Sequence, residues 1–151
     1  MLYRLYHPED FSQLYAIEQA CFQPPIRFPR SYMRKLVKSR NTATWIAEED
    51  YQLSGFAIVE WTIEPDQIIA YIQTVEVAPA HRNRGIATEL LRRIEGSAVA
   101  AGAQTLWLHV AEENAAAIRL YQARGYLPLG REEDYYAPAI PALIFSKSLE
   151  P

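Results

Sequence analysis

The chain of 151 residues carries 15 Lys and Arg against 18 Asp and Glu, and 50% of its residues are hydrophobic. A chain of this length can bury a substantial core without disulfides or metals, so we expect one domain over residues 1–151. A formal charge of −3 argues against the broad basic surface that duplex nucleic acid requires, so no nucleic-acid partner is predicted.

Cysteine usage and hydropathy bear on the compartment. The single Cys21 cannot form an internal disulfide, so nothing indicates an oxidising compartment. No apolar run approaches the roughly 18 residues of a membrane span. The first residues also lack the basic and apolar segments of a signal peptide. We therefore predict a cytoplasmic protein without membrane contact, and both a monomer and a homodimer stay open.

Hydrophobic periodicity and turn residues predict the secondary structure in chain order. The expected elements are a strand at 2–5, a helix opening at 8, a proline-rich break at 23–31, a short helix near 32–37, a hairpin of strands 45–48 and 53–61, a strand at 68–77, a helix from about 85 to 101, a strand at 106–110, a helix at 115–124, strands at 126–130 and 143–149, and a long surface loop at 130–142. Antiparallel pairs come first and strand-helix-strand units later. This order predicts an α/β fold with one mixed sheet covered by helices.

The turn within residues 75–87 joins a strand to a helix and is basic and open. Unpaired N–H groups at a helix N-terminus attract phosphate, and Gly85 and Ala87 leave the backbone accessible. Arg82 and Arg84 add charge that suits phosphate oxygens. The turn lacks both the three glycines of a dinucleotide fingerprint and the Gly-Lys-Ser/Thr of a P-loop. Another phosphate-bearing cofactor is therefore expected.

Two blocks resemble the GNAT superfamily of acetyl-coenzyme A dependent N-acetyltransferases. Arg82-Asn83-Arg84-Gly85-Ile86-Ala87 matches its signature Gln/Arg-x-x-Gly-x-Gly/Ala, and a second block comprises Leu108-His109-Val110, Asn114, Ala117, Tyr121 and Gly125-Tyr126. Tyr135-Tyr136 and Phe28-Pro29-x-Ser31-Tyr32 are most similar to the protein N-terminal acetyltransferases, including the RimI-like enzymes that acetylate the alanine of a ribosomal protein. The resemblance implies a mostly antiparallel sheet with a splayed parallel pair, flanked by about four helices.

The resemblance also implies an acetyl-CoA site, with the pantetheine arm in a gap between the strand ending at Val77 and the strand ending at Val110. Asn114 would reach the arm, and capping the following helix is an equally good role for it. The implied ligands are Val75, Val77, Arg82, Asn83, Arg84, Gly85, Ile86, Ala87, Thr88 and Asn114. No metal is predicted, because His7, His81, His109 and Cys21 lack metal-ligand spacing.

A general acid is implied at Tyr121, whose phenol would protonate the departing thiolate. Tyr121 lies seven residues after Asn114, so both can face the gap from one side of a helix. The alternative is a buried tyrosine that packs beside Ile118 and Leu120.

Two residues are candidates for the general base. His109 faces away from Leu108 and Val110 and titrates near neutrality, so it can take a proton directly or through water. Glu76 faces away from its apolar neighbours and can polarise a water or attract an ammonium. A hydrogen-bonded strand histidine and a surface glutamate are the structural alternatives.

The acceptor is predicted to be a protein or peptide N-terminal α-amine. Such an amine has a pKa of about 7.7–8.0 against about 10.4 for lysine, so a weak base suffices. The resemblance places Phe28, Pro29, Arg30, Tyr135 and Tyr136 around its opening. A small-molecule amine such as a polyamine, amino acid or aminoglycoside is the main alternative, and a non-catalytic acyl-CoA sensor is another.

Overall fold

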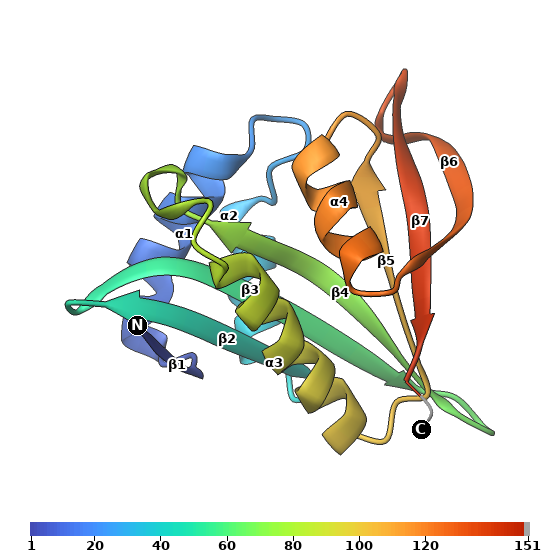
Figure 1. Ribbon diagram of the computed structural model, residues 1–151, viewed down its shortest axis with the longest axis horizontal. Coiled ribbons are helices and arrows are strands. Elements are labelled where there is room, and N and C mark those ends of the chain that lie inside the picture. The colour runs from blue at the N-terminus through green and yellow to red at the C-terminus, as the bar shows by residue number, and fades with distance from the viewer. Residues whose placement is uncertain (150–151) are drawn as a thin grey trace.

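A computed structural model describes residues 1–149 of the chain as one seven-stranded mixed sheet in the order β1-β2-β3-β4-β5-β7-β6, with helices on both faces (Figure 1). The elements are β1 Leu2–Leu5, α1 Phe11–Cys21, α2 Arg30–Lys38, β2 Thr42–Glu49, β3 Gln52–Ile63, β4 Ile68–Val77, α3 Ile86–Ala100, β5 Thr105–Ala111, α4 Ala115–Ala123, β6 Leu127–Ala137 and β7 Ile140–Ser148. Short 3-10 turns lie at Pro8–Asp10 and Pro79–His81. The predicted element order and mixed sheet are confirmed.

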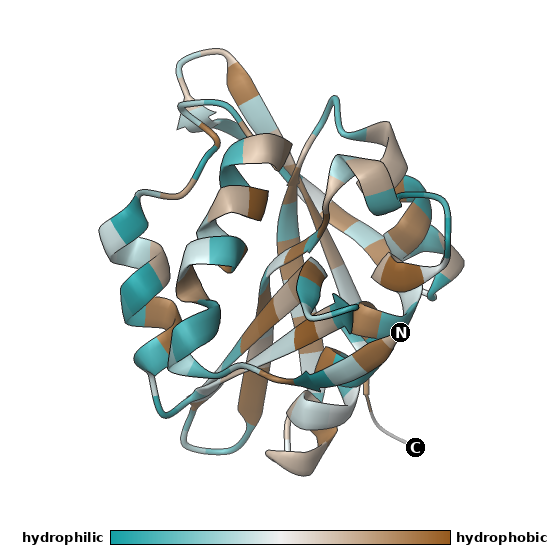
Figure 2. Ribbon diagram, turned by 90° about the vertical axis from the view of Figure 1, so that its left-hand side faces the viewer, coloured by the Kyte–Doolittle hydropathy of each residue, from teal (hydrophilic) through white to brown (hydrophobic). Residues whose placement is uncertain are grey.

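Two hydrophobic clusters hold the layers together. One lies under α3 and α4 and includes Leu90, Leu91, Ile94 and Tyr126, each at most 1% exposed. The other packs α1 and α2 against the opposite face through residues such as Leu14 and Met33. Figure 2 shows the sheet between the two helical layers, with hydrophobic residues along its strands. Among residues 1–149, no helix is long and apolar enough to cross a bilayer.

The only parallel neighbours in the described sheet, β4 and β5, separate along their length. Their pairing runs from Ile69 opposite Thr105 to Ile72 opposite Leu108 and then stops, although both strands continue. At the same point Gln73 is an extra residue of β4 against β3, which is a β-bulge and reverses the alternation of side chains. One edge of β4 is therefore free of β5 beyond the bulge.

The prediction of a long surface loop at 130–142 is wrong. These residues form the ends of β6 and β7, and Ala137 pairs with Ile140 across a tight turn. The sequence did not indicate the full length of β6, because this strand is the edge of the sheet and residues 127–135 are exposed on both faces. Apolar and polar residues therefore do not alternate along it. Helix α2 also begins earlier than expected, at Arg30, because Pro29 lies at the N-cap, where its missing N–H costs nothing.

Candidate active site

A cavity of about 530 Å³ lies where β4 and β5 have separated, and we call it the β4–β5 cleft. It is bounded by the end of β4, the loop before α3, the start of α3 and one side of α4. Its lining residues are Cys21, Phe22, Ile26, Val75, Glu76, Val77, His81, Arg82, Asn83, Gly85, Ile86, Ala87, Thr88, Ala111, Glu113, Asn114, Ala116, Ala117 and Leu120. The free edge of β4 and the N-terminus of α3 thus meet in one opening.

The start of α3 has a backbone geometry that leaves its first amides without helical partners. Gly85 is the N-cap with a φ of 80°, and Asn83 also has a positive φ, of 63°. The first bond of the helix runs from Glu89 N to Gly85 O at 3.2 Å, so the amides of residues 86–88 precede it. Apart from Gly85 and its two neighbours in the chain, no atom of residues 1–149 lies within 4 Å of the position that a Cβ on Gly85 would take. The exposed amides and the positive end of the helix dipole suit a phosphate group.

All the residues predicted to bind the coenzyme line the β4–β5 cleft except Arg84, whose guanidinium pairs with Glu49 at 2.8 Å. Arg82 lies at the cleft wall and donates to Val77 O at 3.1 Å. Asn114 Oδ1 accepts from Ala117 N at 3.2 Å, which confirms its predicted cap. Its predicted contact with the pantetheine arm remains a prediction.

A second cavity, of about 740 Å³, lies on the α1–α2 face of the same strands, and we call it the aromatic hollow. Its lining residues are Pro25, Ile26, Arg27, Phe28, Pro29, Tyr32, Glu60, Thr62, Glu64, Ile69, Tyr71, Gln73, Trp107, His109, Tyr135 and Tyr136. Ile26 lines both cavities, so the hollow and the cleft are neighbours across the separating strands. Arg30 lies elsewhere, with its guanidinium 5.2 Å from the ring centre of Tyr15.

Tyr71 and His109 form a hydrogen-bonded pair inside this hollow. The Tyr71 hydroxyl lies 2.7 Å from His109 Nδ1, and His109 Nε2 lies 3.1 Å from Glu132 Oε1. A carboxylate only accepts, so this network assigns the proton to Nε2 and makes Tyr71 the donor to Nδ1. Burial, followed by the neighbouring Tyr135 and Tyr136, raises the pKa of Tyr71, which keeps its hydroxyl protonated.

Aromatic rings fix the orientation of His109. Its side chain is 7% exposed and stacks on Tyr135 with 3.9 Å between ring centres. Trp107 packs beside it at 5.2 Å and against Tyr71 at 4.7 Å. Leu108 points instead into the core under α3, so the predicted orientation of His109 is confirmed.

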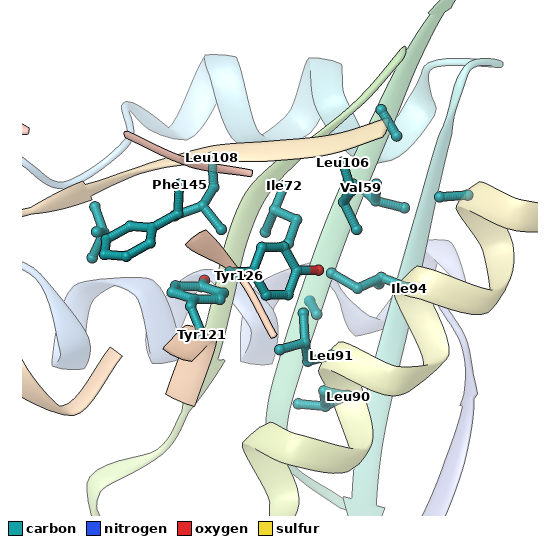
Figure 3. Packing of buried hydrophobic residues seen from close by; sticks show 14 of the residues in the cluster. Val59, Ile72, Leu90, Leu91, Ile94, Leu106, Leu108, Tyr121, Tyr126 and Phe145 are labelled. Carbon is teal, nitrogen blue, oxygen red and sulfur yellow. The ribbon is translucent and has the colours of Figure 1, made fainter. Parts of the chain in front are cut away.

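Tyr121 lies in the hydrophobic core. Figure 3 shows its ring beside Tyr126, and their centres are 5.5 Å apart in an edge-on arrangement. Burial, followed by the charges of Tyr136 and Glu76, raises the pKa of Tyr121. The phenol is therefore a proton donor at neutral pH. Tyr121 is not among the described residues that line the β4–β5 cleft, whereas its neighbour Leu120 is, so the packing alternative for Tyr121 describes its position.

Glu76 is buried rather than at the surface, with 2% of the residue exposed. Its Oε2 accepts from Thr74 Oγ1 at 2.7 Å. Burial, and then the carboxyl of Glu18, raise the pKa of Glu76 well above its usual value. The glutamate lies against the cleft but faces α1.

Sequence reasoning missed Tyr71, although it lies directly opposite Trp107 in the sheet register. Simple alternation from Glu76 assigns Tyr71 to the other face, and the bulge at Gln73 reverses this. Tyr71, Gln73 and Glu60 lie beside one another across β3 and β4. The polar groups on these strand residues are the feature of the sequence that could have indicated a site here. Gln73 Nε2 donates to Glu60 Oε1 at 2.9 Å.

A family model described as the acetyltransferase (GNAT) family matches residues 11–126. Streptothricin acetyltransferase of Streptomyces lavendulae is 37% identical over 87 residues, which are 58% of this chain and 45% of that protein. The ribosomal protein bS18-alanine N-acetyltransferase of Haemophilus ducreyi is 27% identical over 132 residues, 85% of this chain and 83% of that protein. The chain thus spans about half the length of the streptothricin enzyme, and it spans 63% of histone acetyltransferase MCC1 of Arabidopsis thaliana.

Solved structures share the fold. NAA60 of Arabidopsis thaliana in complex with a bisubstrate analogue superposes with a TM-score of 0.83 at 22% identity, covering 97% of both chains. The ribosomal-protein-S18-alanine N-acetyltransferase of Escherichia coli has a TM-score of 0.84 at 22% identity, covering 99% of this chain and 94% of that one. With the family match over residues 11–126 and this common fold, the chain belongs to the GNAT acetyltransferase family.

Proposed function

We propose that the chain transfers the acetyl group of acetyl-CoA to the α-amine of a protein or peptide N-terminus. The observation that carries this proposal is the Tyr71–His109 hydrogen bond of 2.7 Å, inside an aromatic hollow that adjoins the β4–β5 cleft. Such a site offers a proton acceptor, rings that hold a peptide, and a separate opening for a coenzyme.

The residues of the cleft fit acetyl-CoA, which supplies the activated acetyl thioester. The amides of residues 86–88 and Arg82 would hold the pyrophosphate, since both favour anionic oxygens. The free edge of β4 at Val75 and Val77 would pair with the amides of the pantetheine arm in the manner of an added strand. Solved relatives are complexes with acetyl-CoA and with coenzyme A, which supports this ligand.

The amine must be neutral before it attacks. We assign its proton to a two-residue relay, in which the Tyr71 hydroxyl accepts it and passes its own proton to His109 Nδ1. The resulting imidazolium donates from Nε2 to the Glu132 carboxylate. Tyr121 remains the proposed acid for the thiolate, since its raised pKa means that the hydroxyl is protonated at neutral pH.

An α-amine suits this relay because its pKa lies about 2.5 units below that of lysine. The bS18-alanine N-acetyltransferase relatives and the bisubstrate complex of NAA60 are consistent with a peptide acceptor. Phe28, Pro29, Tyr135 and Tyr136 would contact the first residues of the peptide. The streptothricin acetyltransferase relative favours the second candidate, a small-molecule amine.

The test is release of free coenzyme A from acetyl-CoA in the presence of peptides with free or blocked N-termini, polyamines, amino acids and aminoglycosides. We expect turnover only with free N-termini. Turnover restricted to small amines would overturn the acceptor but keep acetyl transfer. Tyr121→Phe should bind coenzyme A as the unaltered chain does and turn over more slowly. Tight coenzyme binding with no turnover on any amine would instead support a sensor.

A further inference from the structure

Two carboxyl groups are buried against each other where α1 crosses the end of β4. Glu18 is 1% exposed and Glu76 is 2% exposed. Cys21, one helical turn after Glu18, has its Sγ 3.5 Å from the carbonyl oxygen of Val77, which follows Glu76 in β4. The Glu18 carboxyl also contributes to the raised pKa of Glu76. Among residues 1–149, neither takes part in an ion pair; the polar partners are the Phe28 amide for Glu18 and Thr74 for Glu76. Two adjacent carboxylates without a cation repel strongly in a dry interior.

The oxygens that have no hydrogen-bond partner indicate how the repulsion between the two carboxyls can be relieved. Glu18 Oε2 accepts from Phe28 N at 2.9 Å, and Glu76 Oε2 accepts from Thr74 Oγ1 at 2.7 Å. The other oxygen of each carboxyl, Oε1, is buried and has no hydrogen-bond partner in the described part of the chain. Buried polar atoms are rarely left unpaired. One proton between these two oxygens makes one a donor and the other an acceptor, and so pairs both at once.

We propose that Glu18 and Glu76 share a single proton, with Glu76 as the acid and Glu18 as the carboxylate, and that this pair positions the α1–α2 loop, residues 22–29, against β4. Its effect on acetyl transfer rests on the function proposed above. The loop is tied to α1 at Phe28, whose N–H donates to Glu18 and whose carbonyl accepts from Tyr15 at 2.7 Å. Phe28 lines the aromatic hollow, so the pair acts through the loop rather than on the reacting atoms.

Among the residues that the structure describes, no cationic side chain pairs with either carboxyl. From α1, Cys21 faces the pair, and burial raises the pKa of its thiol. The Arg82 guanidinium binds Cys21 Sγ at 3.4 Å and Val77 O, not the carboxyls. From α4, Tyr121 is influenced by Glu76 but is itself neutral. On β3, the residue opposite Glu76 is the apolar Phe56. The pair therefore holds its proton well above the ordinary pH for a carboxylic acid and loses it to solvent in alkali.

The decisive experiment is a pH titration of the glutamate side-chain carboxyl carbons by ¹³C NMR, in the unaltered chain, Glu76→Gln and Glu18→Gln. We expect one glutamate of the unaltered chain to titrate far above the others. In Glu76→Gln the amide donates to Glu18 at every pH, so this titration disappears. In Glu18→Gln the amide donates to Glu76, so the elevated titration moves down toward the ordinary range, and the elevation that remains is the contribution of burial.

Unfolding provides a second readout. A native state that holds one extra proton becomes less stable as pH rises from the ordinary carboxyl pKa to the raised one, and the unfolding equilibrium constant increases about tenfold per pH unit. Glu76→Gln should lack this dependence, and Glu18→Gln should show it over a narrower pH range. Asp10→Asn is the matched control, because Asp10 is buried but paired with Arg4 at 2.8 Å, and it should keep the dependence. An elevated titration that stays at the same pH in Glu18→Gln would show that burial alone retains the proton, and would overturn the pair.

The role in positioning is measured with the acceptor. In the unaltered chain the acceptor KM should rise once the shared proton is lost, while Glu76→Gln keeps a flat KM over the same range. A KM profile identical in both proteins would refute the positioning role. His109→Ala separates the two proposals, since it should abolish turnover yet leave the carboxyl titration intact. If no amine is acetylated, the proposed function fails, but the titration of the glutamate carboxyls still shows whether Glu18 and Glu76 share a proton.

Discussion

Replacing Tyr71 with Phe removes a single oxygen atom from the aromatic hollow and leaves its ring in place against Trp107, 4.7 Å away. That oxygen lies 2.7 Å from His109 Nδ1, so the substitution deletes the proposed relay and leaves a buried nitrogen without its donor. A positioned acid–base group contributes about 10²–10⁴ to the rate. We therefore expect kcat/KM for a peptide acceptor to fall at least about 100-fold, equivalent to about 2.7 kcal/mol of the barrier.

The loss should fall on kcat with little change in coenzyme affinity, measured by coenzyme A release and by direct binding. Stability should fall by only about 1 kcal/mol, the usual contribution of one neutral hydrogen bond. Tyr135→Phe is the matched control: its hydroxyl is 3.5 Å from that of Tyr71 and its ring still stacks on His109, so its activity should change far less. Because Tyr71 and His109 act as one relay, the double variant Tyr71→Phe/His109→Ala should lose no more than His109→Ala alone. Unchanged turnover in Tyr71→Phe, or multiplicative losses in the double variant, would refute the relay.

Three further predictions concern stability and are checked by denaturant unfolding. Gly85→Ala should cost about 1–2 kcal/mol because φ is 80°, whereas Gly96→Ala, inside α3 and equally free of neighbours, should gain about 0.5–1 kcal/mol; equal effects would contradict a backbone cause. Glu95→Gln should cost about 1–3 kcal/mol, since the buried Glu95 carboxylate accepts from two cationic side chains and a tyrosine hydroxyl, and a cost near zero would contradict this. Burial alone would raise the pKa of Asp10, but Arg4 and a backbone amide hold it below its usual value. The Asp10 carboxylate therefore contributes its full stabilisation above about pH 4, and this stabilisation is lost as the pH falls through the pKa of Asp10 in the folded protein. Asp10→Asn should make the free energy of unfolding depend less on pH in acid.

The order of strands and helices follows from local patterns of apolar residues and turn residues in the sequence. Apolar residues at helical spacing in Leu90, Leu91 and Ile94 all lie in the core, and Gly102 and Gly125 take the positive φ expected after a helix. The turn at Gly85 and the start of α3 were likewise predictable, because they need only residues that are adjacent in sequence. Strand β6 was not, since an edge strand exposed on both faces carries no alternation.

The sequence by itself determined the mixed sheet, the loop and helix start that would hold a phosphate, and the direction of His109 from its strand. Only the tertiary structure decided which groups meet His109 and Glu76. The bulge at Gln73 turns Tyr71 toward His109, and the crossing of α1 over β4 buries Glu18 against Glu76. Both contacts join residues far apart in the chain, 38 positions in the first case, so no local periodicity encodes them. Side-chain direction along a strand is local, but the partner across the sheet is set by register, and one extra residue is enough to change it.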